Sequence, residues 1–257
     1  MSKCSMVCIL MNINQKLQLE DGAERANQKH FRILIGGLIY LTHTRLDISF
    51  SVGVVSRFMS NPSQIHCGAA KRILRYVACT LNYGIWYIHS INFKLIGFTE
   101  NDWASSLDDR RNTYGNVFGL GSGAVTWNSK KQANVALSTI EAEYVAASAE
   151  ACQCIWIRRM LRDLHQTQQK KIELYCDNKS AIESSKNPAF HGRAKHIELR
   201  FYFIRDLINK GELIMKFCHT EVQVADIFTK SLSNERYAYL RSLLRLSDYE
   251  SRGVLEI

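Results

Sequence analysis

The sequence predicts an α/β fold in which a small helical segment precedes a three-stranded antiparallel meander and then an α-β-α-β-α series. Three observations support this prediction. Apolar residues recur at helical spacing through residue 92. Short β-type runs, separated by polar turns, follow from residue 93. Beyond them, helical patterns alternate with single apolar strands, as in an α/β domain.

Residues 1–92 are expected to form the helical segment. The stretch "HFRILIGGLIYLTH" is apolar enough for a buried helix, in which Gly36 and Gly37 would allow close packing. The stretch "DISFSVGVVSRFM" repeats apolar residues at helical spacing, namely Ile48, Val52, Val55 and Phe58. The stretch "NPSQIHCGAAKRILRYVACTL" begins with turn and cap residues and continues as a helix with a basic face.

Residues 93–232 are expected to form the α/β domain. Its meander is predicted in "FKLIGFT", "YGNVFGL" and "GAVTWNS". A long helix, "STIEAEYVAASAEACQCIWIRRMLRDLH", opens with a capping-box pattern from Ser138 to Glu141. After it we expect, in order, the strand "KIELYCD", the helix "NKSAIESSKN", the helix "AKHIELRFYFIRDLINKG" and the strand "ELIMKFCH". Gly211 is expected to end the second of these helices. A last helix is expected to begin in "EVQVADIFTKSL", and residues 233–257 are expected to form a helical tail.

Composition favours some classes of protein and excludes others. The net charge is +9, and residues 1–92 carry ten Lys/Arg against four Asp/Glu, which favours a polyanionic partner such as nucleic acid. The eight cysteines form no CxxC pair and no zinc-type spacing, so we expect reduced thiols in an intracellular protein. No signal peptide is expected, and the longest uncharged apolar run is too short to span a membrane.

Carboxylates stand at the ends of several predicted elements. Glu100 and Asp102 end the first strand of the meander and would share one face of it. Glu143 lies in the first turn of the long helix, Asp177 directly follows "IELYC", and Asp226 lies in the first turn of the last helix. Such positions gather at one edge of an α/β sheet, where Mg²⁺ or Mn²⁺ would neutralise the carboxylates. Ordinary solvated loop acids would give the same spacing.

Several long stretches of the sequence are more distinctive. They are "FRILIGGLIYLTHTRLDISFSVGVVSRFM", "AAKRILRYVACTLNYGIWY", "GFTENDWASSLDDRRNTYGNVFGLGSGAVTWNSKKQ", "ALSTIEAEYVAASAEACQCIWIRRML", "YCDNKSAIESSKNPAFHGRAKHIELRFYFIRD" and "VQVADIFTKSL". In this order they resemble the C-terminal part of the Pol polyprotein of copia-type retrotransposons, especially those of plants. The resemblance implies a reverse transcriptase remnant with thumb- and connection-like helices in residues 1–92. It implies a ribonuclease H-like fold in residues 93–232, which would hydrolyse the RNA strand of RNA–DNA hybrids.

The resemblance also implies roles for the five acids. The family phrase resembling "GYSDADWAG" places its first acid on Glu100 and its second on Asp102. The words "STIEAEY", "YCDN" and "ADIFTK" place Glu143, Asp177 and Asp226 in the DEDD metal-binding set of ribonuclease H enzymes. The implied cofactor is a pair of Mg²⁺ ions, with Mn²⁺ as an alternative. The implied partners are an RNA–DNA hybrid and the polymerase part of a reverse transcriptase, in cytoplasmic virus-like particles or the nucleus, with no membrane.

Other polar residues are weaker candidates. The candidate nucleic-acid contacts, for which solvated surface is the alternative interpretation, are Lys130, Lys131, Arg158 and Arg159. For His196 we expect a structural or nucleic-acid-positioning role rather than metal ligation. His219 lies seven residues before Asp226, on a loop where a ribonuclease H often carries a mobile histidine. Such a histidine aids product release or proton transfer, so His219 is a candidate catalytic residue.

Two departures from the family limit the expected activity. Glu100 replaces the family's Asp, and the extra methylene moves the carboxylate by about one C–C bond, whereas ligands need placement within roughly half an ångström. We therefore expect weak or absent hydrolysis. The "YVDD"-type motif, fingers and palm are missing, so we expect no polymerase activity. Two hypotheses remain: a metal-dependent ribonuclease H, and a non-catalytic relic that keeps the fold and binds nucleic acid. The order of the acids disfavours an integrase, which uses D,D,E.

Overall fold

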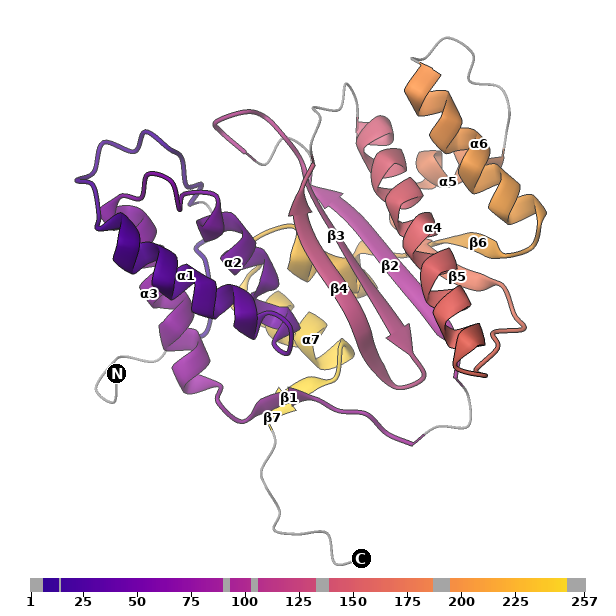
Figure 1. The fold of residues 1–257 in the computed structure, drawn as a ribbon, viewed down its shortest axis with the longest axis horizontal. Coiled ribbons are helices and arrows are strands. Elements are labelled where there is room, and N and C mark those ends of the chain that lie inside the picture. Colours follow the sequence, from indigo (N-terminus) through magenta and orange to yellow (C-terminus); the bar gives the residue numbers. More distant parts are fainter. Residues whose placement is uncertain are drawn as a thin grey trace, which may run out of the picture. The chain divides into compact units, whose positions relative to one another are not determined.

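The chain is divided into two units, residues 1–87 together with 231–257, and residues 88–230 (Figure 1). A computed structural model describes residues 7–13, 15–89, 93–102, 106–132, 139–186 and 195–248. It describes the backbone alone for residues 139–145, 184, 186 and 195–201. The tail expected at residues 233–257 therefore belongs to the same unit as the N-terminal helices.

The first unit is mainly helical. Its elements are α1 (Gln28–Leu41), η1 (Leu46–Ile48), α2 (Ser49–Ser56), α3 (Gln64–Cys79), β1 (Tyr83–Ile85), α7 (Asn234–Leu243) and β7 (Leu246–Asp248). Strands β1 and β7 pair antiparallel, which joins the two ends of the unit. The predicted helical spacing is confirmed through η1 and α2, because Ile48, Val52 and Val55 are buried, as is Phe58 in the turn after α2.

Helix α1 is less buried than its apolar sequence predicts. Phe31, Ile35 and Leu38 are buried, but Tyr40 is 80% exposed. A Cβ added at Gly36 or Gly37 would meet nothing within 4 Å in the described part of the chain, so the close packing expected there is wrong. A helix buries one stripe at a period of 3.6 residues, and a uniformly apolar segment does not indicate which stripe that will be.

A buried polar network ties α7 to the N-terminal helices of the same unit. Arg45 donates to both carboxylate oxygens of Asp47, at 2.9 and 2.7 Å, and Tyr76 donates its hydroxyl to Asp47 at 2.6 Å. From α7, Tyr237 donates its hydroxyl to the Asp47 carbonyl at 2.9 Å, and Arg241 donates to the Tyr76 hydroxyl at 2.9 Å. Because Asp47 is 1% exposed, the bonds from Arg45 and Tyr76 satisfy a charge that would otherwise be costly to bury.

The second unit contains a five-stranded mixed sheet. Its strands are β2 (Leu95–Asp102), β3 (Thr113–Leu120), β4 (Gly123–Lys131), β5 (Ile172–Cys176) and β6 (Leu213–Phe217). The spatial order is β4-β3-β2-β5-β6, with antiparallel pairing among the first three strands and parallel pairing from β2 onwards. The connecting helices are α4 (Thr139–Asp163), α5 (Lys179–Lys186) and α6 (Lys195–Asn209). The predicted meander followed by α-β-α-β is confirmed.

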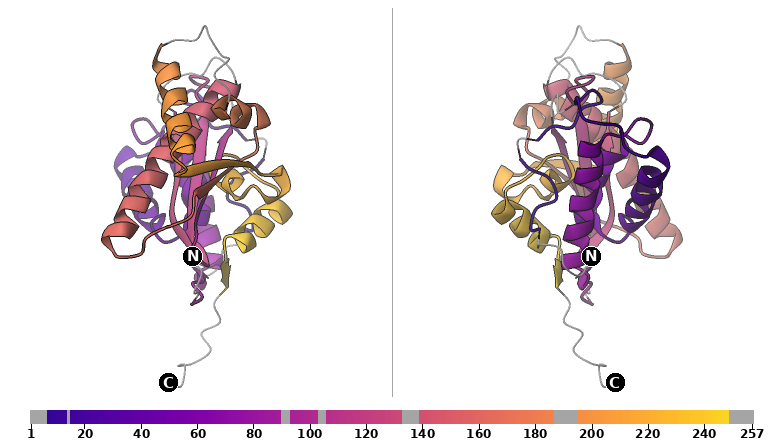
Figure 2. Two further views of the ribbon diagram at one scale, coloured as in Figure 1. Left: turned by 90° about the vertical axis from the view of Figure 1, so that its right-hand side faces the viewer. Right: turned by 90° about the vertical axis from the view of Figure 1, so that its left-hand side faces the viewer.

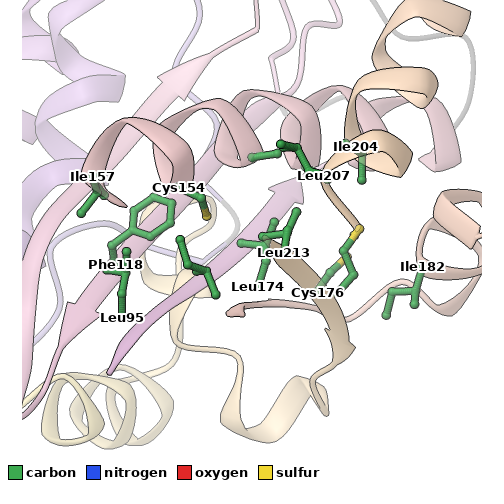
Figure 3. Packing of buried hydrophobic residues seen from close by; sticks show 14 of the residues in the cluster. Leu95, Phe118, Cys154, Ile157, Leu174, Cys176, Ile182, Ile204, Leu207 and Leu213 are labelled. Carbon is green, nitrogen blue, oxygen red and sulfur yellow. The ribbon is translucent and has the colours of Figure 1, made fainter. Parts of the chain in front are cut away.

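One face of this sheet forms the core with α4 and α6, which lie on the same side of the sheet (Figures 1 and 2). Figure 3 shows Leu95, Phe118 and Leu174 from three neighbouring strands facing Cys154 and Ile157 of α4. Each buried side chain of this size contributes roughly 1.5–3 kcal/mol. Glu100 alternates with the core-facing residues of β2 and therefore belongs to the opposite face of the sheet.

The end of the second unit differs from the prediction. The helix expected from "EVQVADIFTKSL" is replaced by two short 3₁₀ helices, η2 (Thr220–Val222) and η3 (Val224–Phe228). Gln223 between them has φ −73° and ψ 92°, which is extended and prevents one continuous α-helix. The capping box predicted at Ser138 lies outside the described residues. No helix in the described ranges combines the length and the apolar character that crossing a membrane needs.

Candidate metal-binding site

A lysine bridges two buried carboxylates at the end of the central strand. Glu100 on β2 is 5% exposed, and Asp226 in η3 is 2% exposed. The Lys230 Nζ lies 3.2 Å from Glu100 Oε1 and 2.8 Å from Asp226 Oδ1. Burial alone would lower the pKa of Lys230, but the two carboxylates outweigh burial and raise it. The ammonium thus stays charged between two anions that lie 126 positions apart in the chain.

Close packing against β3 brings η3 to this place. Gly115 is the register partner of Glu100, and a Cβ there would lie 2.5 Å from Phe228 Cβ. Only a glycine therefore lets η3 approach the strand so closely. Ser129 on β4 donates its hydroxyl to the Phe228 carbonyl at 2.6 Å. Gln223, which is fully buried, donates to the Thr99 carbonyl at 3.0 Å, next to Glu100.

Buried amides fix the strand ends beside Glu100. Gln132 donates through Nε2 to Asn101 Oδ1 at 3.1 Å and accepts from Asn112 Nδ2 at 3.2 Å. The Gln132 backbone N–H also donates to the Asn112 carbonyl at 2.8 Å. All three side chains are buried, and their mutual bonds link the end of β2 to residues flanking β3 and β4.

Asp177 lies at the same edge of the sheet. Strands β2 and β5 are parallel, with Phe98 opposite Tyr175, and continuing both chains by two residues leads to Glu100 and Asp177. Neighbouring strands are about 4.8 Å apart, so these carboxyl groups belong to adjacent positions on one edge. Asn178 then caps α5, accepting from the Ala181 N–H at 3.0 Å, and the chain turns away. The structure thus joins Glu100 and Asp226 through Lys230 and places Asp177 after the neighbouring strand, while a site shared by all three acids stays a prediction.

His219 follows the neighbouring strand at that edge. Cys218 donates its backbone N–H to the Cys176 carbonyl at 2.9 Å, so His219 and Asp177 come directly after two bonded residues. The His219 side chain is exposed, and its ring meets Phe217 edge-on with centroids 5.0 Å apart. Its place at the edge agrees with the sequence expectation, while its role stays a prediction.

The remaining acids are placed less fully. Asp102 is half-buried at the end of β2, on the Glu100 face by alternation. Glu143 lies near the start of α4, and His196 lies in α6. The structure describes the backbone of these two residues but not their side chains. Among the side chains that the structure describes, no three or more of His, Cys, Asp and Glu gather as a metal site. Buried carboxylates with a cation between them nevertheless form an oxygen donor set that fits Mg²⁺ or Mn²⁺.

The candidate nucleic-acid contacts have different surroundings. Lys130 is exposed on β4, whereas the Lys131 Nζ lies 2.7 Å from Asp109 Oδ1. Burial would raise the pKa of Asp109, but hydrogen bonds from Lys131 and other groups outweigh it and lower the pKa to about 2. Lys131 thus forms an ion pair with Asp109, whereas the side chain of Lys130 is accessible to solvent.

Arg158 does not lie with the carboxylates. Its guanidinium donates to the carbonyls of Lys170 and Glu212, the latter at 3.0 Å. These carbonyls precede β5 and β6, whereas Asp177 follows β5, so Arg158 lies at the opposite end of the sheet. Arg158 thus links the starts of two strands, and its role as a nucleic-acid contact stays a prediction. The adjacent Arg159 is exposed on α4.

Sequence reasoning missed several residues that shape this unit. Lys230 has a readable signal, because it follows Asp226 by four residues, the spacing of a local ion pair. Gly115 and Gln223 have no such signal in the sequence, because their roles depend on contacts with residues that are distant from them in the chain. Glu150 on α4 is also unexpected: it is 1% exposed and accepts a hydrogen bond from Asn116. Burial raises the pKa of Glu150 to about 8 despite that bond.

Similar sequences occur in retrovirus-related Pol polyproteins of transposons. The polyprotein from transposon RE1 of Arabidopsis thaliana is 37% identical over 222 residues, which are 86% of this chain and 15% of that protein. The polyprotein from transposon TNT 1-94 of Nicotiana tabacum is 39% identical over 211 residues, 82% of this chain and 16% of that protein. The chain therefore corresponds to a small part of these relatives. No family model matches the chain.

Solved structures with similar arrangements are more distant. The N-terminal RNase H domain of Rv2228c from Mycobacterium tuberculosis has 11% identity and a TM-score of 0.40, covering 58% of this chain and 97% of that one. LC11-RNase H1 isolated from compost has 14% identity and a TM-score of 0.41, covering 58% and 98%. A foamy viral protease-reverse transcriptase in complex with dsDNA has 11% identity and a TM-score of 0.42, covering 80% and 40%.

Proposed function

The chain belongs to the Pol polyproteins of plant copia-type retrotransposons, and on this premise we propose that residues 93–232 form a ribonuclease H that acts on RNA–DNA hybrids with divalent metal ions. The observation that carries the proposal is the meeting of Glu100 and Asp226 at one buried point, beside the strand that leads to Asp177. Three carboxylates from distant parts of the chain at one sheet edge are difficult to explain as solvated loop acids.

The chain's own residues have distinct parts in this proposal. Glu100, Asp177 and Asp226, with Glu143 from α4, supply the oxygen atoms that would hold the metal ions. A pair of metal ions held there would provide the charge stabilisation and water activation that hydrolysis of a phosphodiester needs. The buried amides around Asn101 and the packing of η3 on Gly115 hold Glu100 and Asp226 in place, which matters because metal ligands tolerate little displacement. Hydrolysis of the RNA strand leaves a 3′-hydroxyl and a 5′-phosphate.

The test is cleavage of a labelled RNA–DNA hybrid by the whole chain in Mg²⁺ or Mn²⁺. We expect slow cleavage that Asp226→Asn abolishes and that excess EDTA stops. Asp206→Asn, which changes an exposed acid on α6, is the matched control and should cleave like the unmodified chain. Circular dichroism verifies that both variants keep the fold. Cleavage that survives Asp226→Asn would exclude this site as its source.

A second function is favoured by the position of Lys230. The Lys230 ammonium already pairs with both Glu100 and Asp226, so a positive charge lies between the two carboxylates without a metal ion. The alternative is therefore a non-catalytic relic that keeps the fold and binds nucleic acid through its net charge of +9. Under this alternative the hybrid binds in EDTA and remains intact in Mn²⁺. The salt dependence of that binding would report how many phosphates the chain contacts.

A further inference from the structure

The ammonium of Lys230 lies at the point where the two buried carboxylates converge. We propose that Lys230 is a positioning residue that serves as an internal counter-ion for Glu100 and Asp226, and that a divalent cation must displace it to bind there. The displacement step depends on the proposed function, whereas the counter-ion role in the metal-free chain does not.

Charge balance supports the counter-ion role. The side chains of Glu100 and Asp226 are 6% and 2% exposed, so water screens their repulsion poorly. A cation between two such carboxylates is favourable because it attracts both. Lys230 is that cation, at 3.2 Å from Glu100 and 2.8 Å from Asp226, and its removal would take away a positive charge that both buried carboxylates share.

The geometry of the lysine also supports displacement. Its backbone N–H donates to the Asp226 carbonyl at 3.2 Å, directly after η3, so the main chain is fixed close to the carboxylates. The side chain is 32% exposed, and its four-carbon stem can carry the ammonium into solvent without backbone movement. The main chain of Lys230 is therefore fixed near the carboxylates, whereas its ammonium can move away from them.

The same chain provides a matched comparison. Lys210 on the turn after α6 pairs with Asp206 at 2.6 Å with the same four-residue spacing. Both of those side chains are more than half exposed, at 59% and 53%. An exposed pair of this kind contributes little to stability, so Lys210→Met removes an equivalent local bond without uncovering a buried charge.

Thermal unfolding of the full chain in EDTA and in a Mn²⁺ series tests the proposal. In EDTA we expect Lys230→Met to lower the melting temperature by about 5–10 °C, because it uncovers two buried charges. Lys230→Arg should lower it less, and Lys210→Met should leave it unchanged. In Mn²⁺, Lys230→Met should show the larger gain in melting temperature, with a half-saturating Mn²⁺ concentration about tenfold lower than that of the unmodified chain.

Each contrary result has a distinct meaning. An unchanged melting temperature for Lys230→Met in EDTA overturns the counter-ion role. A half-saturating Mn²⁺ concentration that is equal or higher in Lys230→Met overturns displacement. If Mn²⁺ stabilises neither protein, displacement and the metal site of the proposed function fail together. Should Lys230→Met not fold, the Asp226→Asn/Lys230→Met double variant removes one anion with the cation, and its failure to recover stability would also contradict the counter-ion role.

Discussion

Glu100 and Gly115 are register partners on β2 and β3, and the missing side chain at Gly115 allows η3 to lie against the strands beside Glu100. The carboxylate from the strand and Asp226 from η3 therefore meet because of a glycine that carries no chemistry of its own. This relationship makes the candidate site sensitive to changes that leave every acidic residue in place.

Gly115→Ala should separate η3 from the sheet. The new Cβ would lie 2.5 Å from Phe228 Cβ and 2.9 Å from Thr229 Cγ2, so backbone must move rather than a flexible side-chain end. We expect a loss of about 1–3 kcal/mol in the free energy of unfolding, measured by urea denaturation. Gly119→Ala on the same strand is the control, because its nearest neighbour would be at 3.5 Å. Equal losses in the two variants would contradict this account.

Glu150→Gln should change the pH dependence of stability. Burial raises the pKa of Glu150 from 4.5 to about 8, so the folded state binds a proton that the unfolded state has released between these values. The free energy of unfolding should therefore fall as pH rises from about 4.5 to about 8. Glu150→Gln should flatten this decline and be the more stable protein near pH 8, as measured by urea denaturation. Glu183→Gln, on the exposed surface of α5, should keep the decline.

Tyr237→Phe should weaken the first unit. It removes the hydroxyl that donates to the Asp47 carbonyl at 2.9 Å and leaves a buried acceptor with one partner fewer. We expect a loss of about 1–2 kcal/mol in the free energy of unfolding by chemical denaturation. Tyr239→Phe on the same helix is the control, since that side chain is 45% exposed. A loss for Tyr239→Phe as large as that for Tyr237→Phe would mean that the network is not the cause.

Glu100→Asp should increase hybrid cleavage if the longer side chain misplaces a metal ligand. A misplacement of about 1 Å costs roughly a hundredfold in rate, so a gain of about 10- to 100-fold in single-turnover cleavage is expected. Glu183→Asp shortens an exposed side chain by the same methylene and should have no effect. A lower rate for Glu100→Asp would show that the pocket has adapted to glutamate.

The sequence predicts the arrangement of the sheet well because its signals are local. Alternation and turn residues mark β2, β3 and β4, and Gly211 ends α6 with φ +71°, as expected of a helix stop. The places of Glu100 and Asp177 at one edge were also predictable, since β2 and β5 are parallel and end there. The family resemblance, rather than spacing, singled these acids out from the others.

What the sequence does not predict depends on long-range contacts. Arginine is a residue type that often contacts phosphate. The bonds of Arg158 to the carbonyls before β5 and β6 nevertheless place it at the end of the sheet opposite Asp177. The 3₁₀ form of η3 depends on Gln223, whose side chain bonds to Thr99, 124 positions away. The exposed stripe of α1 depends on which face meets its neighbours, and apolar content alone does not reveal that.

The pairing of residues 1–87 with residues 231–257 sets an order of events during synthesis. A ribosome completes residues 88–230 before it adds Tyr237 and Arg241, so the sheet-containing unit has all its parts while the helical unit still lacks α7. Until α7 is made, residues 1–87 lack Tyr237 as a donor to the Asp47 carbonyl and Arg241 as a donor to the Tyr76 hydroxyl. Chaperone demand and premature cleavage should therefore concentrate on residues 1–87, which are made before residues 88–230 but complete their unit after them.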